Sequence, residues 1–352
     1  MKKCAQLIIL SIFLGNVSVV STASQEELNF GVKNCVSIMK ECVADAVSAM
    51  RSTFNRVFKL KKAPVTISSA AYSVATEPNV RYGGRMEDRF IVDLKKGLCG
   101  VFDGHGGQSV SQYIVDKALD AGDARIIALF DHYFSLLGRE DVALKAVFAH
   151  IEEELWKNKD KSNVFGYKKN GKLEVYGDAG STVLLAKLTD GKLVVANVGD
   201  SRAVLIRNGK VVGATVDHTP SPHSAEEHRI LRSVKKYHLS NPIFHYGVWR
   251  IAGLAMSRSL GDVNQVKMHP SIGGCKHIGQ EIVSAVPDIF SWDVCKADIL
   301  ILATDGLWDV INSDEAASIA SKSTKNDMAT IFKNTALERG SKDNITVVII
   351  FL

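Results

Sequence analysis

Short apolar runs separated by turn residues dominate the chain from about residue 65 onward, a pattern that predicts β-strands. The clearest case covers residues 181–216, where Asp190-Gly191 and Asn208-Gly209 each stand between runs rich in β-branched residues. These dipeptides favour two-residue hairpin turns, so we predict an antiparallel meander of about four strands here. Three further apolar runs predict strands within 98–102, 298–308 and 344–352.

Helical spacing of apolar residues appears between these strands. It predicts helices at about 108–120, 142–157, 314–323 and 327–340. Hairpin-linked strands mixed with grouped helices are typical of α+β proteins. We therefore expect an α+β sandwich of stacked antiparallel sheets with helices, and not a parallel doubly wound sheet.

The segment 24–63 has a different character. Apolar residues recur in it at helical spacing, and it holds seven Lys or Arg against four Asp or Glu. Such a basic amphipathic extension can bind a membrane or a partner, and it can equally pack on the main domain. Pro64 marks the predicted start of that domain, residues 64–352.

The first 23 residues predict a targeting segment. Lys2 and Lys3 precede an apolar stretch, and Ser21 and Ala23 have the spacing that signal peptidase accepts. A cleaved signal predicts a secreted or secretory-compartment protein with no membrane span in the mature chain, whereas an uncleaved leader would anchor it. Removal of residues 1–23 leaves five cysteines, an odd and sparse set that does not form a disulfide framework.

Composition and charge narrow the class of protein. The 352 residues are 46% hydrophobic and 23% charged, which is ordinary for a globular protein. The net charge of +5 lies in the leader and the extension, so the main domain is close to neutral. A neutral domain is not suited to neutralising nucleic-acid phosphates, and we expect no nucleic-acid partner.

Candidate chemistry begins where the apolar run 98–102 ends in Asp103, Gly104 and His105. A carboxylate with neighbouring glycines is often only a tight turn. Here four other stretches also place acids at the ends of predicted strands: Glu87 with Asp88, Asp200, Asp305 and Asp343. This repetition indicates strand ends that converge on one acidic pocket.

Clustered carboxylates raise one another's pKa values unless a cation neutralises them. Oxygen ligands without cysteine favour Mg²⁺ or Mn²⁺ over zinc. Two such ions bridged by Asp103 could activate a water for attack on a phosphate. His105, two residues away, is then a candidate general acid, although a histidine in a turn can also be purely structural.

Eight motifs of this sequence resemble those of the metal-dependent protein phosphatases of type 2C, in the family's order over about residues 70–352. They are "RMEDRF" (85–90), "VFDGHGG" (101–107), "AGSTVLL" (179–185), "NVGDSRAVL" (197–205), "VDHTPS" (216–221), "AMSRSLGD" (255–262), "ATDGLWDVI" (303–311) and "KDNITVVII" (342–350). The resemblance implies one-step hydrolysis of phosphoserine or phosphothreonine on proteins, with no phosphoenzyme.

The resemblance also implies roles for individual residues. Asp103 bridges two Mg²⁺ or Mn²⁺ ions, and His105 is the general acid. One ion takes the carbonyl of Gly104 and the other takes Asp305 and Asp343. Glu87 and Asp88 bind through waters, and Asp200 with Asp305 holds a weaker third ion.

Three departures from the family pattern concern the substrate site. Gly83 stands where the family carries an arginine that grips the substrate phosphate, so Arg81 and Arg85 are the candidates for that role. The segment after "VDHTPS" lacks the family's glycine pair, and Ala252 replaces a common asparagine. These changes predict unusual substrate selection beside the site.

Two alternatives to an active phosphatase remain. The domain could be an inactive, phosphatase-like module that binds phosphoproteins, or the helical extension could be the functional part with the domain as its regulator. Retention of the metal-binding acids and His105 favours the enzyme. We expect a monomer acting on phosphoprotein substrates.

Overall fold

The computed structural model describes residues 70–80, 83–117, 122–158, 166–169, 172–175, 179–189, 191–238, 241–245, 247–263, 279 and 281–352. The chain divides into two units, Met1–Lys62 and Ala63–Leu352. The predicted leader (1–23) and nearly all of the helical extension (24–63) fall in the first unit. Both lie outside the described residues and stay predictions.

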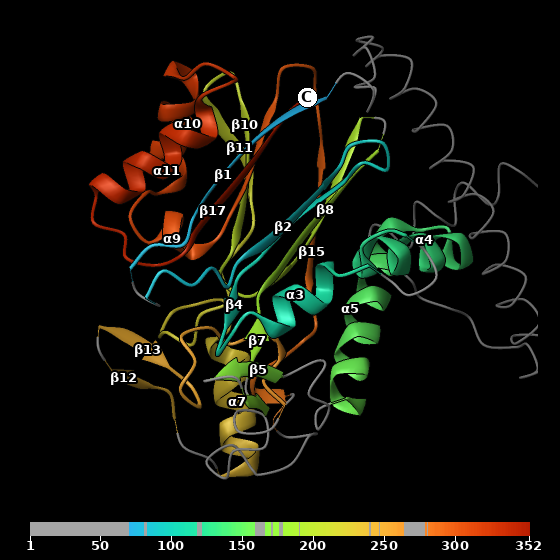
Figure 1. Ribbon diagram of the computed structural model, residues 1–352, viewed down its shortest axis with the longest axis vertical. Helices are drawn as coiled ribbons and strands as arrows, with labels where there is room; N and C mark the ends of the chain where they lie inside the picture. The colour runs from blue at the N-terminus through green and yellow to red at the C-terminus, as the bar shows by residue number, and fades with distance from the viewer. Residues whose placement is uncertain are drawn as a thin grey trace, which may run out of the picture. The chain divides into compact units, whose positions relative to one another are not determined.

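Two five-stranded antiparallel sheets form the centre of the second unit (Figure 1). The first sheet has the strand order β1 (Ala71–Glu77), β17 (Ile345–Phe351), β16 (Ile299–Ala303), β10 (Arg202–Arg207) and β11 (Lys210–Ala214). The second has the order β15 (Asp288–Asp293), β9 (Lys192–Val198), β8 (Val183–Thr189), β3 (Leu98–Phe102) and β2 (Arg89–Asp93).

Three small sheets complete the strands of the described residues. The three-stranded one has the order β14 (Leu260–Gly261), β7 (Gly180–Ser181) and β4 (Gly104–His105). The two hairpins are β5 (Gly166–Lys169) with β6 (Lys172–Val175), and β12 (Ile243–His245) with β13 (Val248–Arg250).

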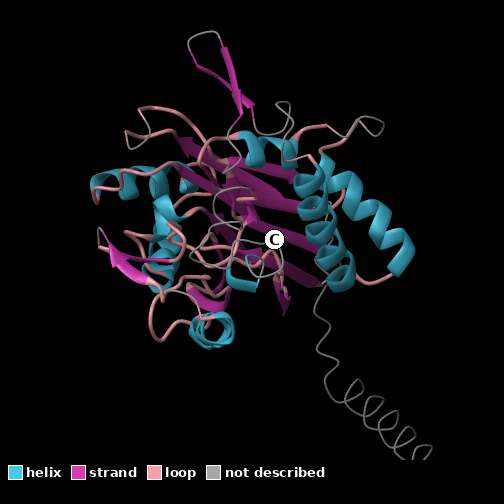
Figure 2. Cartoon of the chain, turned by 90° about the horizontal axis from the view of Figure 1, so that it is seen from below, coloured by secondary structure: helices cyan, strands magenta, loops and turns pink. Residues whose placement is uncertain are grey.

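Helices lie on the outer faces of both large sheets (Figure 2). On the second sheet these are α3 (Ser109–Val115), α4 (Arg125–Leu137) and α5 (Glu140–Lys157). On the first sheet they are α9 (Asp305–Trp308), α10 (Ser313–Lys322) and α11 (Met328–Glu338). A separate helix, α7 (Glu227–Tyr237), lies beyond the ends of the sheets (Figure 1).

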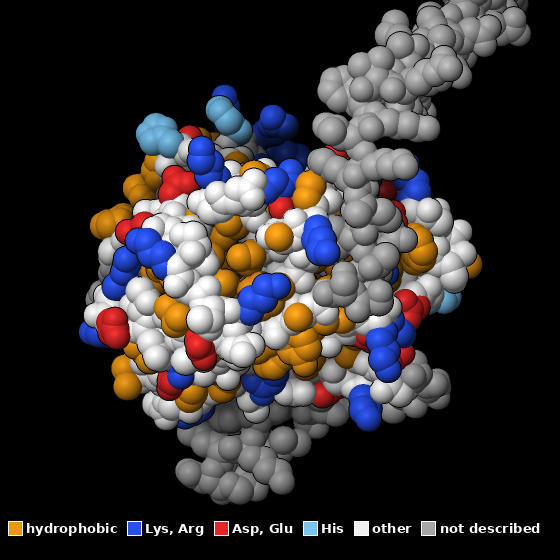
Figure 3. Space-filling model, turned by 90° about the horizontal axis from the view of Figure 1, so that it is seen from above, with side chains coloured by type: hydrophobic (Ala, Val, Ile, Leu, Met, Phe, Trp, Pro, Cys, Tyr) orange, Lys and Arg blue, Asp and Glu red, His pale blue; other side chains and the backbone are white. Residues whose placement is uncertain are grey.

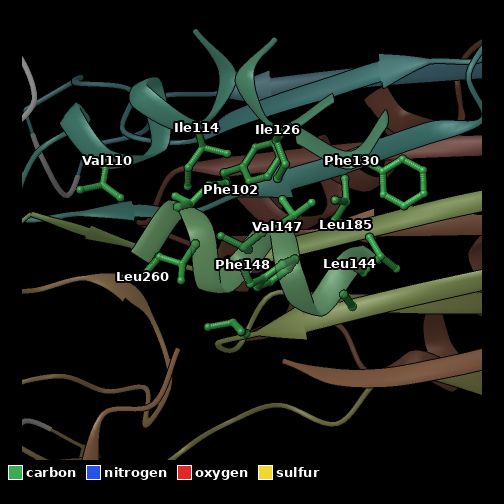
Figure 4. Close-up of a cluster of buried hydrophobic side chains, with 14 of the residues drawn as sticks. Phe102, Val110, Ile114, Ile126, Phe130, Leu144, Val147, Phe148, Leu185 and Leu260 are labelled. Carbon is green, nitrogen blue, oxygen red and sulfur yellow. The ribbon is translucent and has the colours of Figure 1, made fainter. Parts of the chain in front are cut away.

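Successive side chains of a strand point to opposite faces of its sheet. One face of each large sheet therefore packs against helices and the other against the second sheet, which gives four layers. In β3, Leu98 and Phe102 pack against the helices, whereas Cys99 and Val101 pack against the opposite sheet. Figure 4 shows Phe102 among side chains of α3, α4 and α5. Because every side chain of β3 is buried, the strand reads in the sequence as a continuous apolar run.

The predicted sandwich is confirmed, but the predicted meander of residues 181–216 is wrong in one respect. Its four strands exist as β8, β9, β10 and β11, and Asn208 and Gly209 make the hairpin turn with φ of 51° and 71°. However, β8 and β9 belong to the second sheet and β10 and β11 to the first. The link 199–201 therefore crosses between the sheets and places Asp200 between them.

The four predicted helices are present as α3, α5, α10 and α11, with α3 shorter than expected. α4, α7 and the four-residue α9 were not predicted, and α9 occupies the end of the range 298–308 in which a strand was predicted. The apolar stretch of α4 is compatible with strand or helix, and α7 is so polar that only its apolar stripe marks it as a helix.

The described surface mixes charge types. On the face seen from above in Figure 3, basic and acidic side chains are interspersed with apolar ones. Among the described helices, none combines the length and apolar character needed to span a bilayer.

Candidate functional site

The predicted acidic residues come together at one end of the sandwich. In the second sheet Arg89 pairs with Phe102, so Asp88 and Asp103 lie at the same edge. In the first sheet Ala303 pairs with both Arg202 and Val347, which brings the strand ends next to Asp200, Asp305 and Asp343 together. Antiparallel pairing within each sheet thus brings together the ends of strands that lie far apart in the sequence.

Asp103 lies at the centre of this acidic cluster. Its carboxyl lies close enough to those of Asp88 and Asp305 to influence their pKa values. Asp200 interacts electrostatically with Asp103 and Asp305, and Asp343 with Glu87, Asp88 and Asp305. Four of the surrounding acids are buried: Glu87, Asp88, Asp200 and Asp343.

Burial and mutual repulsion raise the pKa values of the clustered carboxyls. Burial is the main cause that raises the pKa values of Asp88 and Asp200 to about 7, with nearby carboxylates adding to it. Burial, followed by the charges of neighbouring acids, raises the pKa values of Asp103 and Asp305 well above the usual range. Burial likewise raises the pKa of Glu87. The cluster therefore holds excess negative charge that needs protons or a cation.

The donor set fits hard divalent cations. Glu87 Oε2, Asp88 Oδ1, Asp200 Oδ1 and Asp305 Oδ1 are buried without a hydrogen-bond partner among the described residues. Buried polar atoms are normally satisfied, and carboxylate oxygens left unsatisfied side by side suit Mg²⁺ or Mn²⁺. No three His, Cys, Asp or Glu side chains of the described residues already surround one point as metal ligands do.

Glycine at two positions allows two pairs of acidic segments to pack with their backbones in direct contact. A Cβ on Gly104 would lie 2.5 Å from the carbonyl oxygen of Glu87, and Ser111 Oγ donates to that same oxygen. A Cβ on Gly306 would lie 2.0 Å from the carbonyl oxygen of Asn344. Glycine at 104 and 306 therefore lets Glu87 approach Asp103, and Asp305 approach Asp343.

Asn344 fastens the segment that carries Glu87 to the segment that carries Asp343. Its Oδ1 accepts from the backbone N–H of Glu87 at 2.7 Å, and its Nδ2 donates to the carbonyl of Arg85 at 2.9 Å. The same amide donates to the carbonyl of Pro78. Since Asn344 is only 2% exposed, these bonds fix Pro78 and residues 85–87 beside the cluster.

Two threonines hold the central acids. Thr304 Oγ1 donates to Asp88 Oδ2 at 2.9 Å, which links the two sheets across the site. Thr182 accepts from the backbone N–H of Asp103 at 3.1 Å and donates its own N–H to the carbonyl of Asp103 at 2.9 Å. The backbone of Asp103 is thereby fixed independently of its carboxyl.

His105 lies beside the cluster and contacts an acid that the sequence did not single out. Its Nε2 lies 2.8 and 2.9 Å from the two carboxylate oxygens of Asp262. Burial opposes protonation of the imidazole, but Asp262, Asp200 and Glu87 outweigh this and raise the pKa of His105. A cationic imidazole next to a phosphate site is a suitable proton donor.

The structure places one of the two candidate phosphate-binding arginines. Arg85 is exposed, and its guanidinium is close enough to Glu87 to lower the pKa of that carboxyl against the effect of burial. Gly83 has a φ of 65° with open space around it. Arg81 lies outside the described residues.

The sequence patterns did not identify three residues near the site. Asp262 and Asn344 lie within the quoted motifs, but their contacts are with residues 157 and 257 positions away. Asp309, whose charge acts on Asp200 and Asp305, follows Asp305 by four residues at the end of α9. The i, i+4 spacing, which places both acids on one helical face, could have indicated Asp309.

Comparison with known proteins agrees with the fold. The protein-family model described as Protein phosphatase 2C matches residues 82–345. The chain belongs to the protein phosphatase 2C family. This is a family of protein serine/threonine phosphatases, and the match includes every described acid of the cluster.

Relatives from a plant and an animal support this assignment. The Arabidopsis thaliana protein named "Probable protein phosphatase 2C 69" is 32% identical over 257 residues, which are 72% of this chain and 61% of that protein. Protein phosphatase 1L of Bos taurus is 28% identical over 364 aligned positions, covering 99% of this chain and 89% of its own. The chain thus spans about three fifths of the plant relative and most of the bovine one.

A solved structure shares the fold. A phosphatase from Toxoplasma gondii superposes with a TM-score of 0.59 at 21% identity, over 80% of this chain and 92% of its own. At this identity the likeness concerns the fold alone, and it agrees with the two-sheet sandwich described above.

Proposed function

We propose that this protein hydrolyses phosphoserine and phosphothreonine esters on protein substrates, using two Mg²⁺ or Mn²⁺ ions. The observation that carries the proposal is the acidic cluster around Asp103, in which four acids keep a buried oxygen without a partner. An acidic site of this kind repels a phosphate dianion unless bound cations reverse its charge.

The acids of the cluster divide the binding of the ions among them. Asp103, the carbonyl of Gly104, Asp305 and Asp343 would hold the two ions directly. Glu87 and Asp88 would act through coordinated waters, and Asp200 with Asp305 would offer a weaker third site. When bound, such ions lower the pKa of water and neutralise charge on the phosphate.

His105 supplies the proton that the departing serine or threonine oxygen needs. The alkoxide of an unactivated alcohol is a poor leaving group, and general acid catalysis contributes roughly 10²–10⁴-fold in such reactions. The acids around His105 raise its pKa and so favour the protonated imidazole, which is the form a proton donor needs.

An assay with the full-length protein tests this function. Purified protein would be given p-nitrophenyl phosphate and a phosphothreonine peptide, first with Mn²⁺ and then with excess EDTA. We expect turnover of both substrates with Mn²⁺ and none with EDTA. A folded protein that turns over neither substrate at any Mn²⁺ concentration contradicts the proposal.

The second candidate function is a non-catalytic module that binds phosphoproteins. It is favoured by one observation, the presence of Gly83 where the family carries its phosphate-binding arginine. Such a module would bind the phosphothreonine peptide, measurable by calorimetry, while leaving its phosphate in place.

Arg85→Ala should raise KM for the phosphothreonine peptide by roughly 10-fold or more, because a hydrogen bond to a charged group is worth about 1.5–3 kcal/mol. The Mn²⁺ concentration for half-maximal activity should stay unchanged. Arg81→Ala, measured in parallel, shows which arginine binds the phosphate. Arg139→Ala is the control, since Arg139 is exposed and pairs with Asp141. Unchanged KM in both the Arg81 and Arg85 variants would mean that another group binds the phosphate.

We also propose that the protein acts as a monomer in a secretory compartment or outside the cell. The support is the leader, Lys2 and Lys3 followed by an apolar stretch and a small-residue cleavage site. N-terminal sequencing of the mature protein should begin near Ser24. A mature chain that keeps Met1 would indicate an uncleaved anchor.

A further inference from the structure

The three-stranded sheet of β14, β7 and β4 joins three distant segments behind His105. Gly180 of β7 pairs with His105 on one side and with Gly261 on the other. This arrangement places Asp262, the residue after β14, directly against the imidazole. The contact is therefore built by backbone pairing, not by a flexible side chain reaching across the site.

Asp262 is held in place from several directions. Its carboxylate is fully buried and accepts from Ser259 Oγ, and its backbone N–H donates to the carbonyl of Ala179 at 3.0 Å. Gly261 donates its N–H to Glu152 of α5 at 3.0 Å. Asp262 has a φ of 54°, a left-handed conformation that is uncommon outside glycine and often retained at functional sites.

Gly180 leaves the space that the pair occupies. A Cβ at this position would lie 2.2 Å from Asp262 Oδ2 and 2.3 Å from His105 Nε2. Any side chain at 180 would separate the histidine from the aspartate. The packing thus admits the contact only because residue 180 is glycine.

The two ring nitrogens of His105 have different surroundings. Nε2 contacts both oxygens of Asp262, whereas Nδ1 is buried and has no hydrogen-bond partner among the described residues. The ring also interacts electrostatically with Asp200 and Glu87 of the acidic cluster. With Nε2 occupied, Nδ1 is the nitrogen left for substrate.

We propose that Asp262 is a positioning residue that holds the proton of neutral His105 on Nε2, so that the imidazolium donates from Nδ1 to the leaving oxygen of the substrate. This inference rests on the proposed function and adds to it the donating atom and the residue that selects it. An aspartate bound to one imidazole nitrogen fixes both the tautomer and the orientation of the ring.

The proton balance of the step follows from this arrangement. Water forms the new bond to phosphorus as the bond between phosphorus and the threonine oxygen breaks. The threonine oxygen takes the proton from Nδ1, and the neutral imidazole keeps its other proton on Nε2 against Asp262. The protons of the attacking water pass to phosphate and solvent, and solvent returns one proton to Nδ1.

Asp262→Asn tests the proposal with two substrates that differ in leaving group. The asparagine amide can donate to Nε2 and so place the proton of the neutral ring on Nδ1, which is then a much weaker acid. We expect kcat for the phosphothreonine peptide to fall by about 10²-fold, the scale of general acid catalysis. p-Nitrophenolate departs without a proton, so kcat for p-nitrophenyl phosphate should change by less than about threefold.

A matched control is the second buried histidine with an aspartate partner. His218 Nε2 lies 3.1 Å from Asp288 Oδ2, and Asp288→Asn alters this histidine–aspartate contact and an ion pair with Arg258 without touching His105. This variant should leave the ratio of kcat for the two substrates unchanged. Equal slowing of both substrates in Asp262→Asn would reduce Asp262 to a structural residue and overturn the proposal.

Nitrogen-15 NMR of the imidazoles tests the tautomer without any turnover. His105→Gln identifies the His105 signals by their loss from the spectrum. The neutral His105 ring of the unsubstituted protein should carry its proton on Nε2, and that of Asp262→Asn should carry it on Nδ1. A proton on Nδ1 in the unsubstituted protein would refute the inference. Absence of turnover with a proton on Nε2 would instead refute the proposed function alone.

Discussion

Asp305→Asn should lower kcat for both substrates by at least about 10³-fold while the protein stays folded. A bound divalent cation contributes several kcal/mol of transition-state stabilisation, and about 4 kcal/mol corresponds to about 10³ in rate. Asp305 is the acid placed to serve this role from the first sheet, since its carboxyl lies beside that of Asp103 and keeps Oδ1 buried without a partner among the described residues. Asparagine keeps the shape of the side chain but removes the charge that binds the metal.

The matched control lies at the other end of the same strand. Asp298 directly precedes β16, is 1% exposed and pairs with Arg207 at 2.7 Å. Asp298→Asn should lower the thermal stability but leave kcat within about threefold, because breaking a buried ion pair affects folding and not the site. Comparable losses of kcat in the two variants would show that the effect of Asp305→Asn is not specific to the acidic cluster.

In excess EDTA the protein should become less stable as the pH rises from 5 to 8, and Mn²⁺ should reverse this trend. The pKa values of Asp88 and Asp200 are raised to about 7 from 3.8 by burial and neighbouring charge. The folded protein therefore holds protons that the unfolded chain has already released. Stability from such a group is complete below its unfolded pKa and is lost as the pH rises through its folded pKa.

The expected size of the effect is considerable. A carboxyl whose pKa rises from 3.8 to about 7 on folding accounts for roughly 4 kcal/mol between the two limits. Because the titrations of the clustered carboxyls are coupled, their combined effect on the free energy of unfolding is smaller than the sum for independent groups. We expect the midpoint of thermal unfolding in EDTA to fall by on the order of 10 °C between pH 5 and pH 8.

Mn²⁺ changes the sign because it binds the deprotonated carboxylates. A ligand at about 100 times its dissociation constant stabilises the folded state by about 2.7 kcal/mol, and metal ligands must lose their protons first. The gain in melting temperature on adding Mn²⁺ should thus be larger at pH 8 than at pH 5. Glu226 and Asp288 do not titrate between pH 5 and pH 8, because ion pairing and hydrogen bonding lower their pKa values to about 2.

Scanning calorimetry at each pH, with EDTA or with Mn²⁺, makes the measurement. Asp88→Asn removes one titrating carboxyl at the hydrogen bond with Thr304, so its curve in EDTA should be flatter than that of the unsubstituted protein. A melting temperature in EDTA that rises from pH 5 to 8 would contradict the protonation of the acidic cluster.

The sequence alone determined the local elements and the positions of the acids. Short apolar runs bounded by turn residues specified most strands of the two large sheets, and Asn208-Gly209 specified a hairpin turn, because backbone geometry limits which residues tolerate each conformation. The acids at 87–88, 103, 200, 305 and 343 could be predicted to share a site because each interrupts an apolar pattern at a strand end.

Only the tertiary structure decided which strands share a sheet and which residues hold the acidic segments and His105 in place. β9 and β10 are apolar on both faces, so no alternation in the sequence shows that the link between them changes sheets. The Asp262 contact with His105 and the hydrogen bonds of Asn344 to Pro78, Arg85 and Glu87 depend on segments brought together by burial of both sheet faces. Such pairings arise from the free energy of packing the whole domain, which no short stretch of sequence encodes.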